Sequence, residues 1–154
     1  MDLTKDDLTM TFAVDNSPDQ VFAAIANVRA WWGKGIEGST DKIGDEFTYR
    51  HKDLHLSKQR LEEAIPGKKL VWLVTDANLS FTADTGEWKG TQLRFDIGRS
   101  GGQTELRFTH VGLNPKRECF EACSKGWAYY VGESLRALLL TGTGRPDPRA
   151  IHHG

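Results

Sequence analysis

One long amphipathic stretch near the C-terminus limits the architectures open to this chain. Between residues 117 and 141, apolar and small side chains recur every third or fourth position, which is the spacing of one helical face. Gly142, Gly144 and Pro146 follow the stretch and end it. The stripe consists of Phe120, Cys123, Trp127, Tyr130, Val131, Ser134, Leu135 and Leu138. A helix of this kind is stable only when another apolar surface covers its stripe.

The sequence before this helix supplies such a surface as a series of strands. Residues 8–15, 47–51, 91–97 and 106–110 alternate between apolar and polar side chains, which predicts half-buried strands. Residues 54–65 and 70–74 are two further strand candidates, whereas residues 76–90 predict an irregular strand or a loop. Ser17 and Gln20 form a capping box around Pro18 and start a helix, and Trp31-Trp32-Gly33 ends it or opens a short second one.

Segregated strands and helices indicate an α+β fold with an antiparallel sheet. We expect a curved sheet of about six strands around one long C-terminal helix, with two short helices after the first strand. A chain of 154 residues fits one domain. Residues 1–144 are therefore expected to form that domain, and residues 145–154 a flexible tail.

Composition excludes several classes of function. The chain carries 20 basic and 21 acidic residues without a basic cluster, so nucleic acid is not an expected partner. It shows no secretory signal and no apolar run of the ~20 residues that cross a bilayer, which predicts a cytoplasmic protein with no membrane contact. Cys119 and Cys123 are expected to be buried, reduced thiols, and no metal site is predicted because no second ligand pair stands at zinc spacing. No cofactor motif is present.

Several short motifs resemble one branch of the START-like (SRPBCC) superfamily, the branch related to the C-terminal domain of the activator of the ninety-kilodalton heat-shock protein ATPase. These motifs are EWKGT (residues 87–91), LRF (93–95), GQTEL (102–106), FTHVGL (108–113) and CSKGW (123–127). The resemblance covers nearly the whole chain and implies the helix-grip fold, with a cavity between sheet and long helix that often holds an apolar or aromatic small molecule. Relatives include cyclases, hydratases, lipid carriers and protein-binding modules, so the fold alone does not fix the function.

Aromatic residues supply the candidate walls of such a cavity, and one histidine supplies a polar group. The predicted ligand-binding residues are Trp31, Trp32, Phe47, Tyr49, Trp72, Phe95, Phe108, His110, Trp127 and Tyr130. For any single ring, ordinary core packing is the alternative interpretation. His51 shares the Phe47–Tyr49 face, whereas His55, His152 and His153 are expected to be exposed. Glu87 is expected at the surface, with entry into a pocket beside Trp88 as the alternative.

These features lead to three hypotheses of function. The first is a binding protein for an apolar or aromatic small molecule. The alternatives are a chaperone-regulating module, with residues 76–90 and 145–154 as candidate surfaces, and an enzyme of the cyclase or hydratase kind with His110 as general acid or base. No recognised catalytic set accompanies His110, which favours the non-enzymatic hypothesis. A homodimer is left open.

Overall fold

A computed structural model describes residues 7–51, 55–80, 82–83 and 85–146 of the chain. Strands and helices occupy most of these residues. Their order is β1 (Leu8–Val14), α1 (Pro18–Ala26), α2 (Val28–Trp31), β2 (Glu37–Gly38), β3 (Glu46–His51), β4 (His55–Ile65), β5 (Lys69–Leu79), β6 (Gln92–Ser100), β7 (Gln103–Val111), α3 (Phe120–Tyr129), the π-helical segment η1 (Tyr130–Leu135) and α4 (Arg136–Thr141).

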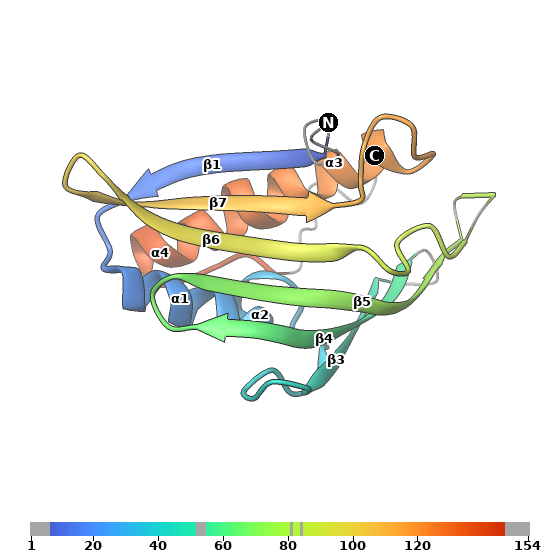
Figure 1. Ribbon diagram of the computed structural model, residues 1–154, viewed down its shortest axis with the longest axis horizontal. Coiled ribbons are helices and arrows are strands. Elements are labelled where there is room, and N and C mark those ends of the chain that lie inside the picture. The colour runs from blue at the N-terminus through green and yellow to red at the C-terminus, as the bar shows by residue number, and fades with distance from the viewer. Residues whose placement is uncertain (1–6, 52–54, 81, 84, 147–154) are drawn as a thin grey trace.

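The strands form one antiparallel sheet with the order β1-β7-β6-β5-β4-β3-β2 (Figure 1). Strand β1 pairs with β7, so the first and last strands in sequence are neighbours, with Leu8 opposite His110 and Val14 opposite Thr104. About six strands were expected and the sheet has seven. The additional strand, β2, is two residues long, which is too short for an alternating pattern to show.

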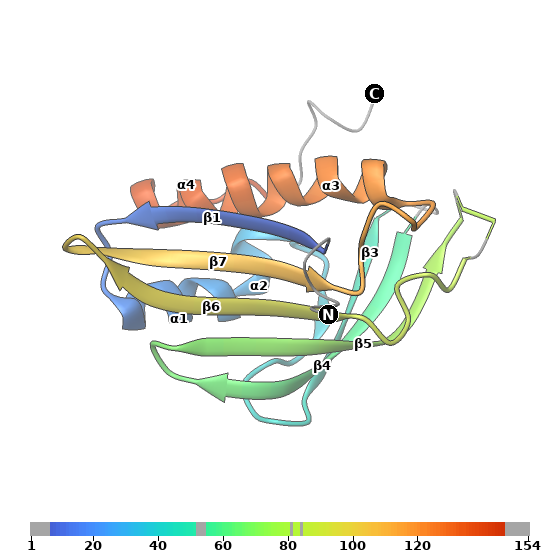
Figure 2. The same ribbon diagram turned by 45° about the horizontal axis from the view of Figure 1, so that its top comes forward.

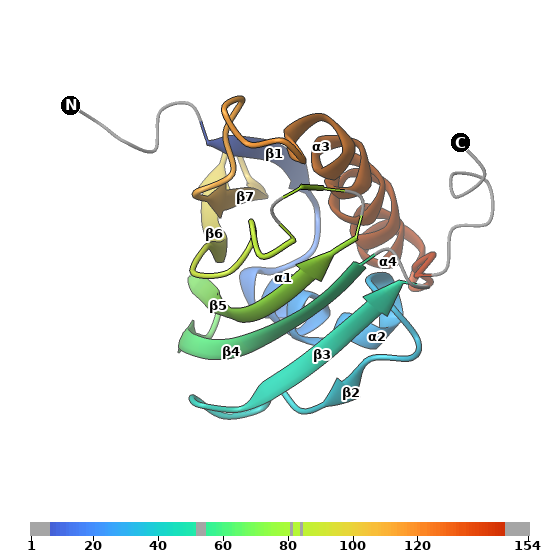
Figure 3. The same ribbon diagram turned by 90° about the vertical axis from the view of Figure 1, so that its right-hand side faces the viewer.

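All helices lie on the concave side of the sheet. Figure 2 shows α3 and α4 running along β1 and β7, and Figure 3 shows the sheet curving from β1 to β2 around the helices. The predicted α+β class, the curved antiparallel sheet and the long C-terminal helix are confirmed, and this arrangement is the helix-grip fold. No helix among the described residues is both long and apolar enough to cross a membrane.

Local sequence signals account for the ends of several elements. Ser17 Oγ accepts the Gln20 N–H at 3.1 Å and Gln20 Oε1 accepts the Ser17 N–H at 2.8 Å, which completes the predicted capping box of α1. Such a cap contributes about 1 kcal/mol. Gly101 and Gly102 have φ values of +55° and +89°, the left-handed conformation that a two-residue hairpin between β6 and β7 requires.

The long C-terminal helix is interrupted by η1, where one extra residue enters the turn. Tyr129, Tyr130 and Val131 are consecutive and all buried there, which a regular helix with one apolar face does not allow. The helix begins at Phe120 rather than near residue 117. Ser134 Oγ donates to the carbonyl oxygen of Trp31 at 2.7 Å and so ties η1 to α2.

The chain stays attached to this helix just beyond α4. The Arg145 N–H donates to Ser134 Oγ at 2.7 Å, and the Arg145 carbonyl oxygen accepts the Tyr129 hydroxyl at 2.7 Å. The expected tail starts at this anchored residue, and residues 147–154 lie outside the described part of the chain.

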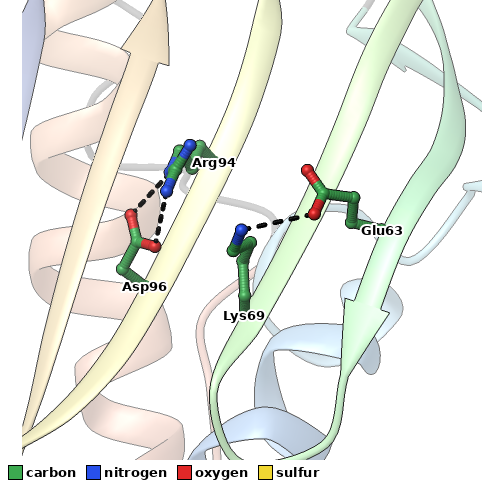
Figure 4. Close-up of polar contacts among 4 residues, drawn as sticks. All are labelled: Glu63, Lys69, Arg94 and Asp96. Carbon is green, nitrogen blue, oxygen red and sulfur yellow. Dashed lines mark hydrogen bonds and ion pairs between the residues drawn. The ribbon is translucent and has the colours of Figure 1, made fainter.

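The convex face of the sheet carries paired charges. Figure 4 shows Arg94 and Asp96 on β6 beside Lys69 on β5 and Glu63 on β4. The Arg94 guanidinium binds Asp96 at 2.8 and 3.2 Å, and Lys69 Nζ lies 3.3 Å from Glu63 Oε1. These side chains are partly exposed, and pairs of this kind contribute about 0–1 kcal/mol each. The convex face is therefore a solvated surface, and the buried aromatic residues lie on the other side.

Candidate functional site

The ten predicted site residues come together on the concave side of the sheet. All are at most 9% exposed, and their rings form a continuous network of contacts that also includes Trp88. The network joins residues of α2, β3, β5, β6, β7, α3 and η1, which approach one another only in the folded protein. Long-range packing, rather than local sequence, therefore creates this interior.

Trp32, directly after α2, lies at the centre of the network. Its ring stacks on Tyr49 at a centroid distance of 4.8 Å, and it meets Trp127 at 5.2 Å and Phe47 at 5.6 Å. Trp32 thus connects the short helices, strand β3 and the long helix. The free energy of such ring contacts is about 0.5–1.5 kcal/mol each beyond the burial of their area.

Two tyrosine hydroxyls meet inside this aromatic interior. Tyr49 Oη and Tyr130 Oη lie 2.8 Å apart, and the two residues are 6% and 9% exposed. Tyr49 comes from β3, whereas Tyr130 opens η1. The π-helical turn and the sheet therefore bring two polar groups together where the surrounding side chains are aromatic.

His110 is fully buried, and both of its ring nitrogens are hydrogen-bonded. Trp127 Nε1–H donates to Nδ1 at 3.0 Å, and Thr91 Oγ1 lies 2.9 Å from Nε2. The Thr91 hydroxyl donates to the Trp88 carbonyl oxygen, so it accepts the Nε2–H of His110. The ring is therefore the neutral Nε2–H tautomer, and burial lowers its pKa from 6.5 to about 3. This network holds Trp127 in place and uses both nitrogens that acid–base chemistry would need.

The inner face of β4 carries three polar residues that sequence reasoning missed. We call His55, Ser57 and Gln59 the β4 polar row; Gln59 Nε2 donates to Ser57 Oγ at 2.6 Å, and Ser57 Oγ lies 3.0 Å from His55 Nε2. Ser57 and Gln59 are completely buried. The pairing of β4 with β3 places this row on the same face as Phe47 and Tyr49.

The expectation that His55 is exposed was wrong. Its imidazole packs between Tyr49 at 5.2 Å and Trp88 at 4.5 Å, because β3 and the segment before β6 close over the start of β4. Burial of the ring lowers its pKa from 6.5 to about 3, and the nearby His51 adds to this effect. His55 is therefore neutral near pH 7. His152 and His153 lie outside the described residues.

Gln59 contains an unpaired buried acceptor. Among the described residues, its Oε1 atom is the one buried side-chain oxygen or nitrogen without a hydrogen-bond partner. Burying such an atom costs about 1–3 kcal/mol. Phe47 on β3 and Val74 on β5 flank Gln59, so the cross-strand neighbours of this amide are apolar.

Residues 85–91 cross one end of the fold, next to α3 (Figure 3). Trp88 stacks on Trp127 at 5.7 Å, and Glu87 accepts the N–H groups of Glu118 and Cys119 at 2.9 Å each. Glu87 is 9% exposed, so its expected surface position was wrong. Burial opposes ionisation of Glu87, but the N–H groups of Cys119 and Glu118 outweigh it and hold the pKa of the carboxyl below its usual value.

Cys119 and Cys123 are buried free thiols beside this segment, as the sequence predicted. Cys123 Sγ accepts the indole N–H of Trp88 at 3.3 Å. Hydrogen bonding to Cys123, together with burial, raises the pKa of Cys119, so this thiol stays protonated. Within the described ranges, no group of three or more His, Cys, Asp and Glu side chains is arranged to hold a metal ion.

Comparison with known proteins places the chain in a family. The family described as "Activator of Hsp90 ATPase homolog 1-like protein" matches residues 15–140. No curated protein matches the chain.

Solved structures share the fold at low sequence identity. The Aha1 dimer from Colwellia psychrerythraea is 22% identical with a TM-score of 0.71, over 90% of this chain and 98% of that one. Protein MLL2253 from Mesorhizobium loti is 15% identical with a TM-score of 0.69, over 90% and 98% of the two chains. DynU16, a protein in the dynemicin biosynthetic locus, is 17% identical with a TM-score of 0.64, over 91% of this chain but 49% of its own. Because the family match spans most of its length, this protein belongs to the Activator of Hsp90 ATPase homolog 1-like family, within the START-like (SRPBCC) superfamily.

Proposed function

We propose that this protein binds a small apolar or aromatic molecule between the concave face of the sheet and the C-terminal helix. The predicted contacts are the aromatic rings around Trp32 and Trp127, with the hydroxyls of Tyr49 and Tyr130 as polar contacts. Binding sites for small molecules combine mostly apolar walls with a few placed polar groups, and this interior has that composition.

The observation that carries the proposal is the set of buried polar groups among the rings. A core that serves stability alone avoids polar atoms, because each one that lacks a good partner costs free energy. This interior nevertheless contains the paired hydroxyls of Tyr49 and Tyr130 and the β4 polar row, in which Gln59 Oε1 has no partner among the described residues. A ligand that interacts with these groups would explain why they are there.

The environment of His110 weighs against the enzymatic alternative. A general acid or base needs a ring nitrogen within reach of a substrate and a pKa near the working pH. Both nitrogens of His110 are bound by Trp127 and Thr91, and burial holds the pKa near 3. We therefore assign His110 a positioning role for Trp127 within the binding site.

The proposal can be tested with neutral aromatic compounds such as naphthalene, 2-naphthol and indole. At a concentration about a hundredfold above the dissociation constant, a bound compound should raise the melting temperature by about 5–10 °C. Binding should also change the tryptophan emission, since Trp31, Trp32, Trp88 and Trp127 belong to the ring network.

A pair of tyrosine variants tests the location. Tyr130→Phe removes a hydroxyl that faces Tyr49, whereas Tyr129→Phe removes the neighbouring hydroxyl that donates to the Arg145 carbonyl. We expect the Tyr130 variant to change the affinity for 2-naphthol several-fold and the Tyr129 variant to leave it unchanged. If no aromatic compound raises the melting temperature or alters the emission, the proposed function is wrong.

The partners proposed from sequence need separate measurements. A fold neighbour was solved as a dimer, which supports a homodimer as a proposal that light scattering across a range of concentrations can test. The family description refers to the activation of Hsp90 ATPase, which supports contact with that chaperone as a second proposal. An unchanged chaperone ATPase rate after addition of this protein would count against it.

A further inference from the structure

In the β4 polar row, one buried side-chain atom has no hydrogen-bond partner among the described residues. Gln59 Nε2 donates to Ser57 Oγ at 2.6 Å, and Ser57 Oγ in turn pairs with His55 Nε2 at 3.0 Å. The hydrogen bonds thus run along the inner face of one strand, from a buried amide to an imidazole. They leave the Gln59 carbonyl oxygen, at the inner end of the row, without a donor.

The position of Gln59 shows what that oxygen lacks. The residue is 0% exposed and lies between Phe47 on β3 and Val74 on β5, on the face that the aromatic network covers. Phe47 contacts both Trp32 and Trp72, so the neighbourhood of Gln59 is apolar and aromatic. A carbonyl oxygen in such surroundings is most favourably satisfied by a single hydrogen-bond donor that arrives with an apolar body.

Charge narrows the class of ligand further. His55 is neutral near pH 7, because burial lowers its pKa to about 3. In the described part of the chain, no lysine, arginine or carboxylate is hydrogen-bonded to the row. An ionised carboxylate or ammonium on the ligand would therefore be buried without a counter-charge, which is strongly unfavourable.

We propose that Gln59 Oε1 anchors the ligand by accepting a hydrogen bond from the O–H or N–H group of a neutral aromatic molecule. The inference rests on the proposed function and specifies its ligand: a phenol- or indole-like compound, in contrast to a hydrocarbon, a fatty acid anion or a cation. The aromatic rings bind the body of the molecule, and the β4 polar row selects its donor.

Matched compounds test the donor requirement in the wild-type protein. 2-Naphthol and indole each carry one donor, and 2-methoxynaphthalene and N-methylindole have the same rings without it. The dissociation constants are measured by calorimetry or tryptophan fluorescence near pH 7. We expect each donor compound to bind roughly tenfold or more tightly than its methylated partner. We expect 2-naphthoate, which is an anion at this pH, to bind more weakly than 2-naphthol and 2-methoxynaphthalene.

Gln59→Met locates the discrimination at one atom. Methionine has a similar length and no acceptor oxygen, so the affinity ratio within each pair should fall to about one. Gln103→Met is the matched control, because Gln103 is exposed and its amide pairs with Asp15 outside the interior; the ratio should persist in this variant. If Gln59→Met does not fold, the amide signal of Gln59 in nuclear magnetic resonance spectra replaces it as readout, and the donor compounds should shift that signal more than the methylated ones.

The outcomes separate the two proposals. If donor and methylated compounds bind equally well, or if Gln59→Met keeps the preference, the anchor is wrong while aromatic binding stands. If none of the compounds binds, the proposed function fails and the anchor fails with it.

Discussion

At the scale of single residues, His110 shows that a buried titratable group can serve packing and still make stability depend on pH. The ring is neutral because Trp127 and Thr91 occupy its two nitrogens and burial disfavours its charged form. In the unfolded chain the same histidine titrates near pH 6.5. Between that pH and about 3, the unfolded state therefore binds a proton that the folded state does not.

This difference predicts acid destabilisation with a known sign. Because the unfolded state holds more protons below pH 6.5, the free energy of unfolding should fall as the pH falls, by up to about 1.4 kcal/mol per pH unit for each such histidine. His55 and His110 both contribute, since burial lowers the pKa of each to about 3. Urea denaturation at a series of pH values between 7 and 5 measures the slope.

His110→Gln should remove about half of that slope. The variant should also lower the free energy of unfolding at pH 7 by about 1–3 kcal/mol, because the Trp127 indole N–H and the Thr91 hydroxyl lose a well-placed partner. An identical pH slope in the variant and the wild type would contradict the assignment of His110 as neutral and buried.

At the scale of elements, residues 85–91 hold the end of the fold closed through Glu87. Its carboxylate accepts two backbone N–H groups just before α3, and charge-assisted hydrogen bonds of this kind are stronger than neutral ones. Glu87→Gln keeps one acceptor oxygen and loses the charge. We expect the free energy of unfolding to fall by about 1–2 kcal/mol and the amides of residues 118 and 119 to exchange faster.

Acid should have the same effect as this substitution. The folded-state pKa of Glu87 lies below its ordinary value, so its contribution is present above that value and is lost as the pH falls through the folded-state pKa. Glu121→Gln is the control, since the Glu121 side chain is 88% exposed and only weakly paired with Lys125. Equal stability of the two variants would show that Glu87 does not hold the segment.

The elements also show how far the sequence could predict the site. The alternation over residues 47–51 and 106–110 gave the strands and placed Phe47, Tyr49 and His110 on their inner faces. The β4 polar row was missed because its inward-facing residues are polar, so no apolar alternation marks the buried face of this part of β4, and its orientation depends on pairing with β3. The π-helical turn could not be predicted from the sequence, because apolar side chains spaced three and four positions apart also fit a regular α-helix in this segment.

At the scale of the whole molecule, the proposed binding groups lie on one face of the sheet and not on the other. The concave face carries the rings and the polar row, and the convex face carries solvated ion pairs (Figure 4). Arg94→Met should therefore change the free energy of unfolding by at most about 1 kcal/mol, and high salt should reduce that difference. Ligand affinity should not change.

Thermal unfolding at low and high salt, together with calorimetry on 2-naphthol, tests this division. A large loss of affinity in Arg94→Met would show that the convex face takes part in binding. Gln59→Met, which changes a residue on the concave face of the same sheet, is the contrasting variant.

The pairing of β1 with β7 determines when this protein can finish folding. Leu8 and Val14 find their partners, His110 and Thr104, only after most of the chain has been made, and the helix that covers the sheet comes later still. During synthesis β1 therefore has no partner strand until β7 has been made, whereas a hairpin such as β6–β7 can form as soon as its two strands have been made. Contacts so far apart in sequence slow folding, so refolding should be limited by this last closure of the sheet.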